Sequence, residues 1–115
     1  MNLNKTNNLK LLLVEDDSML SGALKSYMES QGVTFRVEAR GDRAVDRVRE
    51  FLPDAVILDC LLPGKDGYEI CRELRPMFSG PILMFTAKDE EIDQLLGLGL
   101  GADAYLGKQI GRAHV

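Results

Sequence analysis

The sequence predicts an α/β fold with a doubly wound parallel sheet, and three observations support this. Short apolar runs alternate with amphipathic segments, which gives the order βαβαβαβαβ. The apolar runs have the length of buried strands rather than of helices. The 115 residues are 45% hydrophobic and 28% charged, which suits one soluble domain with a core. Alternation of this kind places helices on both faces of a parallel sheet.

The first half of the chain contains two strands and two helices. Leu9–Val14 is short, apolar and followed by acidic residues, which is typical of a buried strand. Ser18–Gln31 repeats apolar residues at helical spacing and stops at Gly32. Val33–Val37 alternates and is β-branched, as an edge strand would be. Asp42–Phe51 again has helical spacing, and a proline follows shortly after it.

The second half continues the alternation. Ala55–Leu58 is a buried strand, and Tyr68–Leu74 is helical until a proline ends it. Pro81–Phe85 is the next strand. Asp89–Leu100 is a helix that we expect to fray at its end, because its late glycines cost about 1 kcal/mol each. Ala104–Leu106 is the last short strand.

The composition excludes several classes of protein. A net charge of -4 argues against bare nucleic-acid binding. No apolar run approaches the roughly 20 residues of a membrane span. Met1–Asn8 is polar and is no signal peptide, so we expect a cytoplasmic location. Cys60 and Cys71 are expected to be buried thiols, and neither they nor His114 have the spacing of a metal site.

Chemically useful side chains follow four of the predicted strands. Because the carboxyl ends of parallel strands meet at one edge of a sheet, we expect these side chains to lie close together. They comprise carboxylates, a hydroxyl and an ammonium group, at Glu15, Asp16, Asp17, Asp59, Thr86 and Lys108.

This set of groups predicts a phosphoryl site that uses a metal ion. Crowded carboxylates resist joint ionisation, and Mg²⁺, which prefers hard oxygen ligands, relieves the repulsion. A lysine and a threonine beside them suit the oxygens of a phosphate. A carboxylate can act as the nucleophile toward phosphorus, and Asp59 is the only acid on a central strand. We expect Asp17 and Ser18 to cap the following helix instead.

Four motifs carry a resemblance to a known family. LLLVEDD, VILDCLLPGKDG, ILMFTA and GADAYLGK lie within residues 9–108. Together they resemble the receiver domain of two-component response regulators. The loop LLPGKDG and the acidic helix DEEIDQLLGL are most similar to the OmpR/PhoB-like subfamily. The resemblance implies a flavodoxin-like (CheY-like) doubly wound five-stranded parallel sheet with strand order 2-1-3-4-5.

The resemblance also implies roles for individual residues. Asp59 would accept phosphate from a sensor histidine kinase. Asp16 would bind Mg²⁺ directly and Glu15 through water, with Asp59 and the backbone carbonyl of Leu61 completing the site. The remaining roles would be phosphate binding by Thr86, Ala87 and Lys108, switching by Thr86 and Tyr105, and control of dephosphorylation by Leu61 and Lys88.

The function implied is a phosphorylation switch that controls an output, most simply DNA-binding transcription control. Such a chain is no enzyme beyond its own phosphorylation and dephosphorylation. Its partners would be the kinase, a second copy bound through segment 89–106 and a fifth helix, and DNA only through an output domain absent from this chain. A stand-alone receiver acting by protein contact or phosphorelay is the alternative. An Asp-nucleophile phosphatase is disfavoured, because Asp59 lacks the second acid of the Asp-x-Asp motif.

The ends of the chain are expected to lie outside the domain. Residues 1–8 would be a polar lead, 9–108 the receiver, and 109–115 a non-native tail in place of the fifth helix. Gln109 stands where the family has proline, and IGRAHV is the translation of a widely used sequencing adapter. The alternative is a natural tail that diverges from the family.

Overall fold

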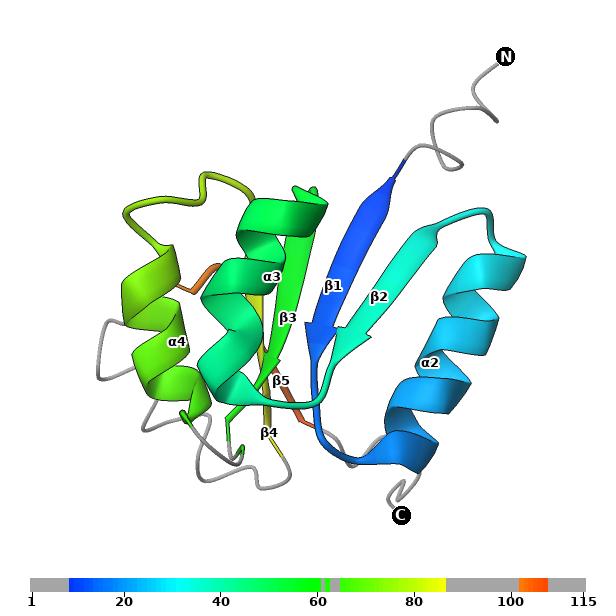
Figure 1. Cartoon of the computed structure of the whole chain (residues 1–115). Helices are drawn as coiled ribbons and strands as arrows, with labels where there is room; N and C mark the ends of the chain where they lie inside the picture. The colour runs from blue at the N-terminus through cyan, green and yellow to red at the C-terminus, as the bar shows by residue number, and fades with distance from the viewer. Residues whose placement is uncertain (1–8, 61, 63–64, 87–101, 108–115) are drawn as a thin grey trace.

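The computed structural model describes residues 9–60, 62, 65–86 and 102–107, with the backbone alone at 86 and 105–107. Within these residues the chain forms one sheet of parallel strands in the order β2-β1-β3-β4-β5 (Figure 1). The predicted fold class and strand order are therefore confirmed. The strands are β1 (Lys10–Val14), β2 (Thr34–Glu38), β3 (Ala55–Asp59), β4 (Ile82–Thr86) and β5 (Ala104–Gly107).

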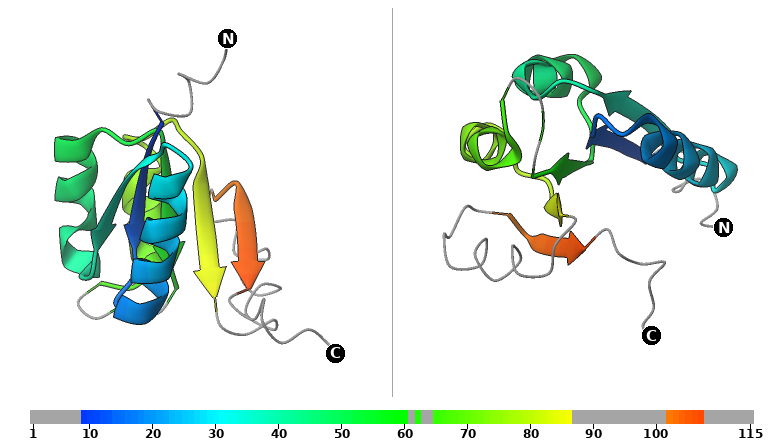
Figure 2. Two further views of the ribbon diagram at one scale, coloured as in Figure 1. Left: turned by 90° about the vertical axis from the view of Figure 1, so that its right-hand side faces the viewer. Right: turned by 90° about the horizontal axis from the view of Figure 1, so that it is seen from below.

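The helices cover both faces of the sheet. They are α2 (Ser18–Ser30), α3 (Ala44–Phe51), which follows a short 3₁₀ turn η1 (Gly41–Arg43), and α4 (Gly67–Leu74). Helices α3 and α4 lie on one face and α2 lies on the other (Figure 2). None of the helices in the described part of the chain combines the length and apolar character needed to cross a bilayer.

The strand β1 shows how the sequence builds two cores. Successive side chains of a strand point to opposite faces. Leu12 and Val14 join the larger core beneath α3 and α4, whereas Leu11 and Leu13 pack with Phe35 and α2. A strand buried on both faces must be apolar at every position, which explains the run of leucines. Cys60 and Cys71 are buried in the larger core, as predicted.

The ends of α2 match the sequence-based prediction. Oδ1 of Asp17 accepts hydrogen bonds from the backbone N–H groups of Met19 at 3.0 Å and Leu20 at 3.1 Å. These bonds satisfy N–H groups that have no partner within the helix. Gly32 ends the helix region with a φ of 86°, a left-handed conformation that glycine adopts without strain.

One local expectation needs correction, and the start of α4 shows contacts that the sequence did not predict. The segment from Asp42 to Phe51 is not one continuous α-helix, because η1 precedes α3. Asp66, in the loop after β3, is the N-cap of α4, and its Oδ1 accepts the N–H of Glu69 at 3.0 Å. Lys65 is half-buried and pairs with Glu73. The predicted helix 89–100 and the expected tail 109–115 lie outside the described residues.

Candidate functional site

Three carboxylates meet at the carboxyl edge of the sheet. Glu15 and Asp16 follow β1, and Asp59 is the last residue of β3. The parallel register pairs Val14 with Leu58, which sets Glu15 level with Asp59. One oxygen from each of Glu15, Asp16 and Asp59 lies within 4.8 Å of the others. The predicted convergence of the acids from two strands is therefore present in the structure. Strands β1 and β3 end at the lower edge of the sheet in Figure 1.

The burial of these acids differs sharply. Glu15 is 1% exposed and Asp59 5% exposed, whereas Asp16 is open to solvent. Buried carboxylates lose their hydration and repel one another, so a nearby cation stabilises them more than it stabilises surface acids. The oxygen-only donor set with one side open to water fits a hexacoordinate Mg²⁺ that keeps several water ligands.

Backbone hydrogen bonds hold the acid cluster in place. The N–H of Glu15 donates to the carbonyl of Glu38 at the end of β2, at 2.9 Å. Oε2 of Glu15 accepts the N–H of Asp17 at 3.0 Å. On the other side, the N–H of Cys60 donates to the carbonyl of Phe85 at 2.9 Å. Hydrogen bonds to β2 and β4 therefore fix the backbone at Glu15 and next to Asp59.

Gly67 is required by close packing. An ideal Cβ built on Gly67 would lie closer than 3.0 Å to the carbonyl oxygen of Asp59, a distance that real Cβ atoms do not tolerate. Its N–H donates to the carbonyl of Cys60 at 3.1 Å. Gly67 is the first residue of α4, and its lack of a side chain makes room for the end of β3.

The remaining predicted site residues are described in part or not at all. Phe85 pairs with Asp59, and Thr86 pairs with Gly107, so the backbone of Thr86 lies at the same edge as the acids. Tyr105, on β5, pairs with Met84 of β4. Four predicted residues lie outside the described part of the chain, namely Leu61, Ala87, Lys88 and Lys108.

A buried acid beside the site was not predicted from the sequence. Glu38, 7% exposed, ends β2. Its Oε1 accepts bonds from Nε and Nη2 of Arg47 at 3.2 and 3.0 Å, and its Oε2 accepts the N–H of Arg40 at 2.9 Å. The hydrogen bond to Glu38 raises the pKa of Arg47. The signal that singled out Asp59 was an acid directly after an apolar central strand, and Glu38 was missed because Val33–Val37 alternates and was predicted as an edge strand.

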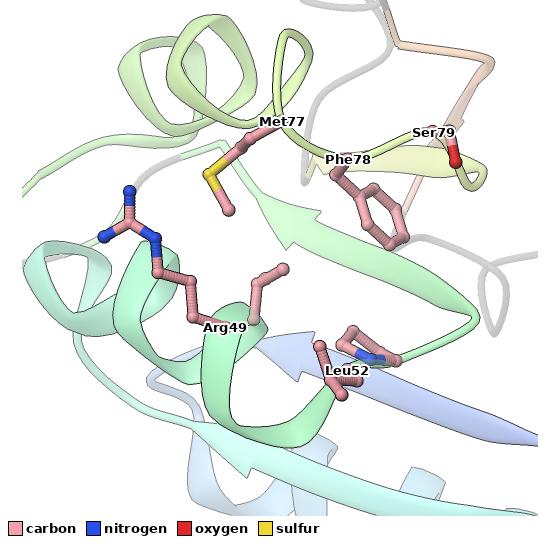
Figure 3. A pocket seen from close by; sticks show the side chains of 7 residues that line it. Arg49, Leu52, Met77, Phe78 and Ser79 are labelled. Carbon is pink, nitrogen blue, oxygen red and sulfur yellow. The ribbon is translucent and has the colours of Figure 1, made fainter.

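A pocket of about 380 Å³ lies at the opposite edge of the sheet (Figure 3). It is formed by the end of α3 and the segment that follows α4, and is lined by Val48, Arg49, Leu52, Pro53, Met77, Phe78 and Ser79. Leu52, in a left-handed conformation with φ 54°, ends α3 there. The pocket adjoins the amino ends of β3 and β4, so it is separate from the acid cluster.

Comparison with known families agrees with this architecture. A family model for the response regulator receiver domain matches residues 11–115. The chain therefore belongs to the response regulator receiver domain family, and it is a receiver domain of the two-component class. The fold and the acid cluster at the carboxyl edge had already pointed to this class.

Solved receiver structures are similar over most of the chain. The BeF₃-activated N-terminal receiver domain of RstA from Klebsiella pneumoniae is 39% identical, with 87% of this chain and 86% of that chain covered and a TM-score of 0.81. A putative response regulator from Chloroflexus aurantiacus is 37% identical, with coverages of 87% and 84% and a TM-score of 0.78. TrrA from Thermotoga maritima, in complex with Mg²⁺-BeF, is 26% identical, with coverages of 90% and 89% and a TM-score of 0.79.

Proposed function

We propose that this receiver takes a phosphoryl group from a sensor histidine kinase onto Asp59 in a reaction that needs Mg²⁺. The observation that supports this most is the cluster of Glu15, Asp16 and Asp59, whose oxygens lie within 4.8 Å of one another. The solved structure of TrrA, a relative in the same family, contains Mg²⁺-BeF. We place this activity in the cytoplasm, where the sequence composition leads us to expect the chain.

The chemistry assigned to Asp59 is nucleophilic transfer. A carboxylate oxygen of Asp59 forms a bond to phosphorus while the N–P bond of the donor phosphohistidine breaks. The imidazole nitrogen leaves with the electron pair of that bond. Mg²⁺, when bound, neutralises charge on the transferring group. Asp16 is the exposed member of the cluster and would bind the ion directly, whereas Glu15 would act through water, and the carbonyl of Leu61 would complete the set.

The other predicted residues would stabilise and read the phosphorylated state. Thr86, Ala87 and Lys108 would bind phosphoryl oxygens by hydrogen bonds and charge. Phosphorylation adds about 1.5 to 2 negative charges, which gives Thr86 and Lys108 a reason to move toward Asp59. Tyr105 would follow Thr86 inward. The output would be DNA-binding transcription control, with a homodimer as the active form. The alternative is a stand-alone receiver, which would act by protein contact or phosphorelay and would need no output domain.

The proposal is tested by phosphorylation from a small donor. The chain is incubated with acetyl phosphate and Mg²⁺, and its intact mass is measured. We expect one phosphate adduct, which is lost in Asp59→Asn and in EDTA and retained in Asp17→Asn as a matched acid control. An adduct that survives Asp59→Asn, or full labelling in EDTA, would contradict the proposal.

The lifetime of the phosphorylated form depends on access of water to the Asp59–phosphorus bond. Leu61 and Lys88 follow Asp59 and Thr86 by two residues, and we place both at the mouth of the site. An apolar Leu61 cannot orient water by hydrogen bonding, so Leu61→Asn should speed dephosphorylation. Decay of the adduct is followed by mass after the donor is removed. An unchanged or slower decay in this variant would count against the role.

A further inference from the structure

The turn η1 touches the segment that leads into α4, although the two are far apart in sequence. An ideal Cβ on Gly41 would lie closer than 3.0 Å to both the carbonyl oxygen and the carbonyl carbon of Lys65, and 3.1 Å from Cδ1 of Ile70. Gly41 is buried and its φ is not positive. Glycine is therefore needed here for contact between two backbones, and not for an unusual backbone angle.

The same segment touches Asp59 two residues later. Gly67 packs on the carbonyl of Asp59 and donates its N–H to the carbonyl of Cys60 at 3.1 Å. The carboxylate of Asp66 caps α4 between these two contacts. A displacement of the Lys65 carbonyl is thus passed along two residues to the backbone that carries Asp59.

The side chain of Lys65 adds a second restraint. Its Nζ lies 2.9 and 2.7 Å from the two carboxylate oxygens of Glu73 on α4. The segment 65–67 is therefore held by Gly41 on one side, by Glu73 through Lys65, and by Asp59 at its end. Groups that support a metal ligand from outside affect metal affinity, and their loss typically costs 10–100-fold.

We propose that Gly41 is a positioning residue for the acid cluster, acting through the Lys65 carbonyl and Gly67 on Asp59, with Glu73 as a second support. This inference rests on the proposed function, since the readout is the affinity of the cluster for a divalent cation. In this proposal neither Gly41 nor Glu73 touches the ion or the phosphate.

The test uses Mn²⁺ as the probe, because its unbound ion gives an electron paramagnetic resonance signal that measures affinity directly. Gly41→Ala should weaken Mn²⁺ binding roughly 10–100-fold. Two glycine controls separate positioning from general destabilisation. In Gly80→Ala the new Cβ would lie closer than 3.0 Å to the carbonyl oxygen of Asp54 at the opposite edge of the sheet, and in Gly22→Ala it would meet nothing within 4 Å. Both controls should bind Mn²⁺ as the wild type does, even where urea unfolding shows Gly80→Ala to be destabilised.

Glu73→Ala gives a milder test that does not depend on the fold of Gly41→Ala. Loss of a part-exposed ion pair should weaken Mn²⁺ binding about two- to fivefold. Glu29→Ala, which removes an exposed carboxylate paired with Lys25, is its control and should bind normally.

The outcomes distinguish this inference from the proposed function. Wild-type affinity in Gly41→Ala overturns the inference alone, and so does an equal loss in Gly80→Ala. If Gly41→Ala does not fold, unchanged affinity in Glu73→Ala overturns the inference. Failure of the wild type to bind Mn²⁺ would overturn the proposed metal site and the inference with it.

Discussion

Asp16 and Asp17 are neighbours in sequence with different tasks. Asp16 belongs to the acid cluster, whereas Asp17 caps α2 through two backbone hydrogen bonds. Asp16→Asn should therefore weaken Mn²⁺ binding by more than about tenfold, the smallest loss typical of supporting groups. Asp17→Asn removes the same charge and should leave the affinity nearly unchanged. Equal losses in the two variants, measured by titration with Mn²⁺, would contradict the assignment of Asp16 as the ligand.

Single residues also mark the limit of what the sequence reveals. Asp59 was identifiable because a charged residue ends an apolar central strand. The requirement for Gly41 was not, because its cause is the carbonyl of Lys65, which lies far away in sequence. The cap at Asp66 was missed for a related reason, since Asp suits both turns and helix starts.

At the scale of elements, Arg75 ties the end of α4 to the amino ends of β4 and β5. Its Nη2 donates to the carbonyls of Phe78 at 2.5 Å and Gly80 at 2.7 Å, and its Nη1 to Asp103 at 3.1 Å. Oδ2 of Asp103 also accepts the N–H of Ile82 at 2.8 Å. The hydrogen bond from the N–H of Ile82 is the largest cause of a lowered pKa of the Asp103 carboxyl, and the hydrogen bond from Arg75 lowers this pKa further.

This arrangement predicts a pH dependence of stability. A carboxyl whose pKa is lowered by folding stabilises the folded chain above its unfolded pKa of about 3.9, and that contribution fades as the pH falls through the lower folded value. Asp103→Asn should therefore be less stable at neutral pH and lose less stability than the wild type below about pH 4. Urea unfolding between pH 7 and pH 2.5 measures the slope of the free energy of unfolding against pH for each of the two proteins. Parallel slopes in the two proteins would contradict the role of Asp103.

The elements themselves were largely predictable. Apolar runs and helical spacing located the described strands and helices to within a few residues, because β1 and β3 contribute to both cores and the edge strand β2 alternates between buried and exposed residues. The 3₁₀ turn before α3 was not predictable from spacing. It forms where buried Gly41 packs against the backbone of Lys65, and that packing is tertiary.

At the scale of the whole molecule, the proposed metal site would link metal binding to stability. The acids stand on the ends of β1 and β3, in the middle of the sheet, so repulsion among them acts on the whole fold. A ligand bound only by the folded state stabilises it by about 2.7 kcal/mol at 100 times its dissociation constant. Mg²⁺ at 100 times its dissociation constant should therefore raise the free energy of unfolding by about that amount, and EDTA should remove the gain.

Asp16→Asn provides the control for this linkage. It should abolish most of the increment from Mg²⁺ and should stabilise the metal-free chain slightly, because one of three crowded charges is gone. Urea unfolding with Mg²⁺ and with EDTA gives both quantities. A full increment from Mg²⁺ in Asp16→Asn would contradict the linkage.

The central claim is that Asp59 carries the phosphoryl group, and locating that group is the most direct test. The chain is phosphorylated with acetyl phosphate and Mg²⁺ and then reduced with borohydride, which converts an aspartyl phosphate to homoserine. Digestion and tandem mass spectrometry then identify the modified position. We predict homoserine at position 59 alone. Homoserine at position 16 or at any other acid, or its absence from a chain whose mass had increased, would contradict the claim.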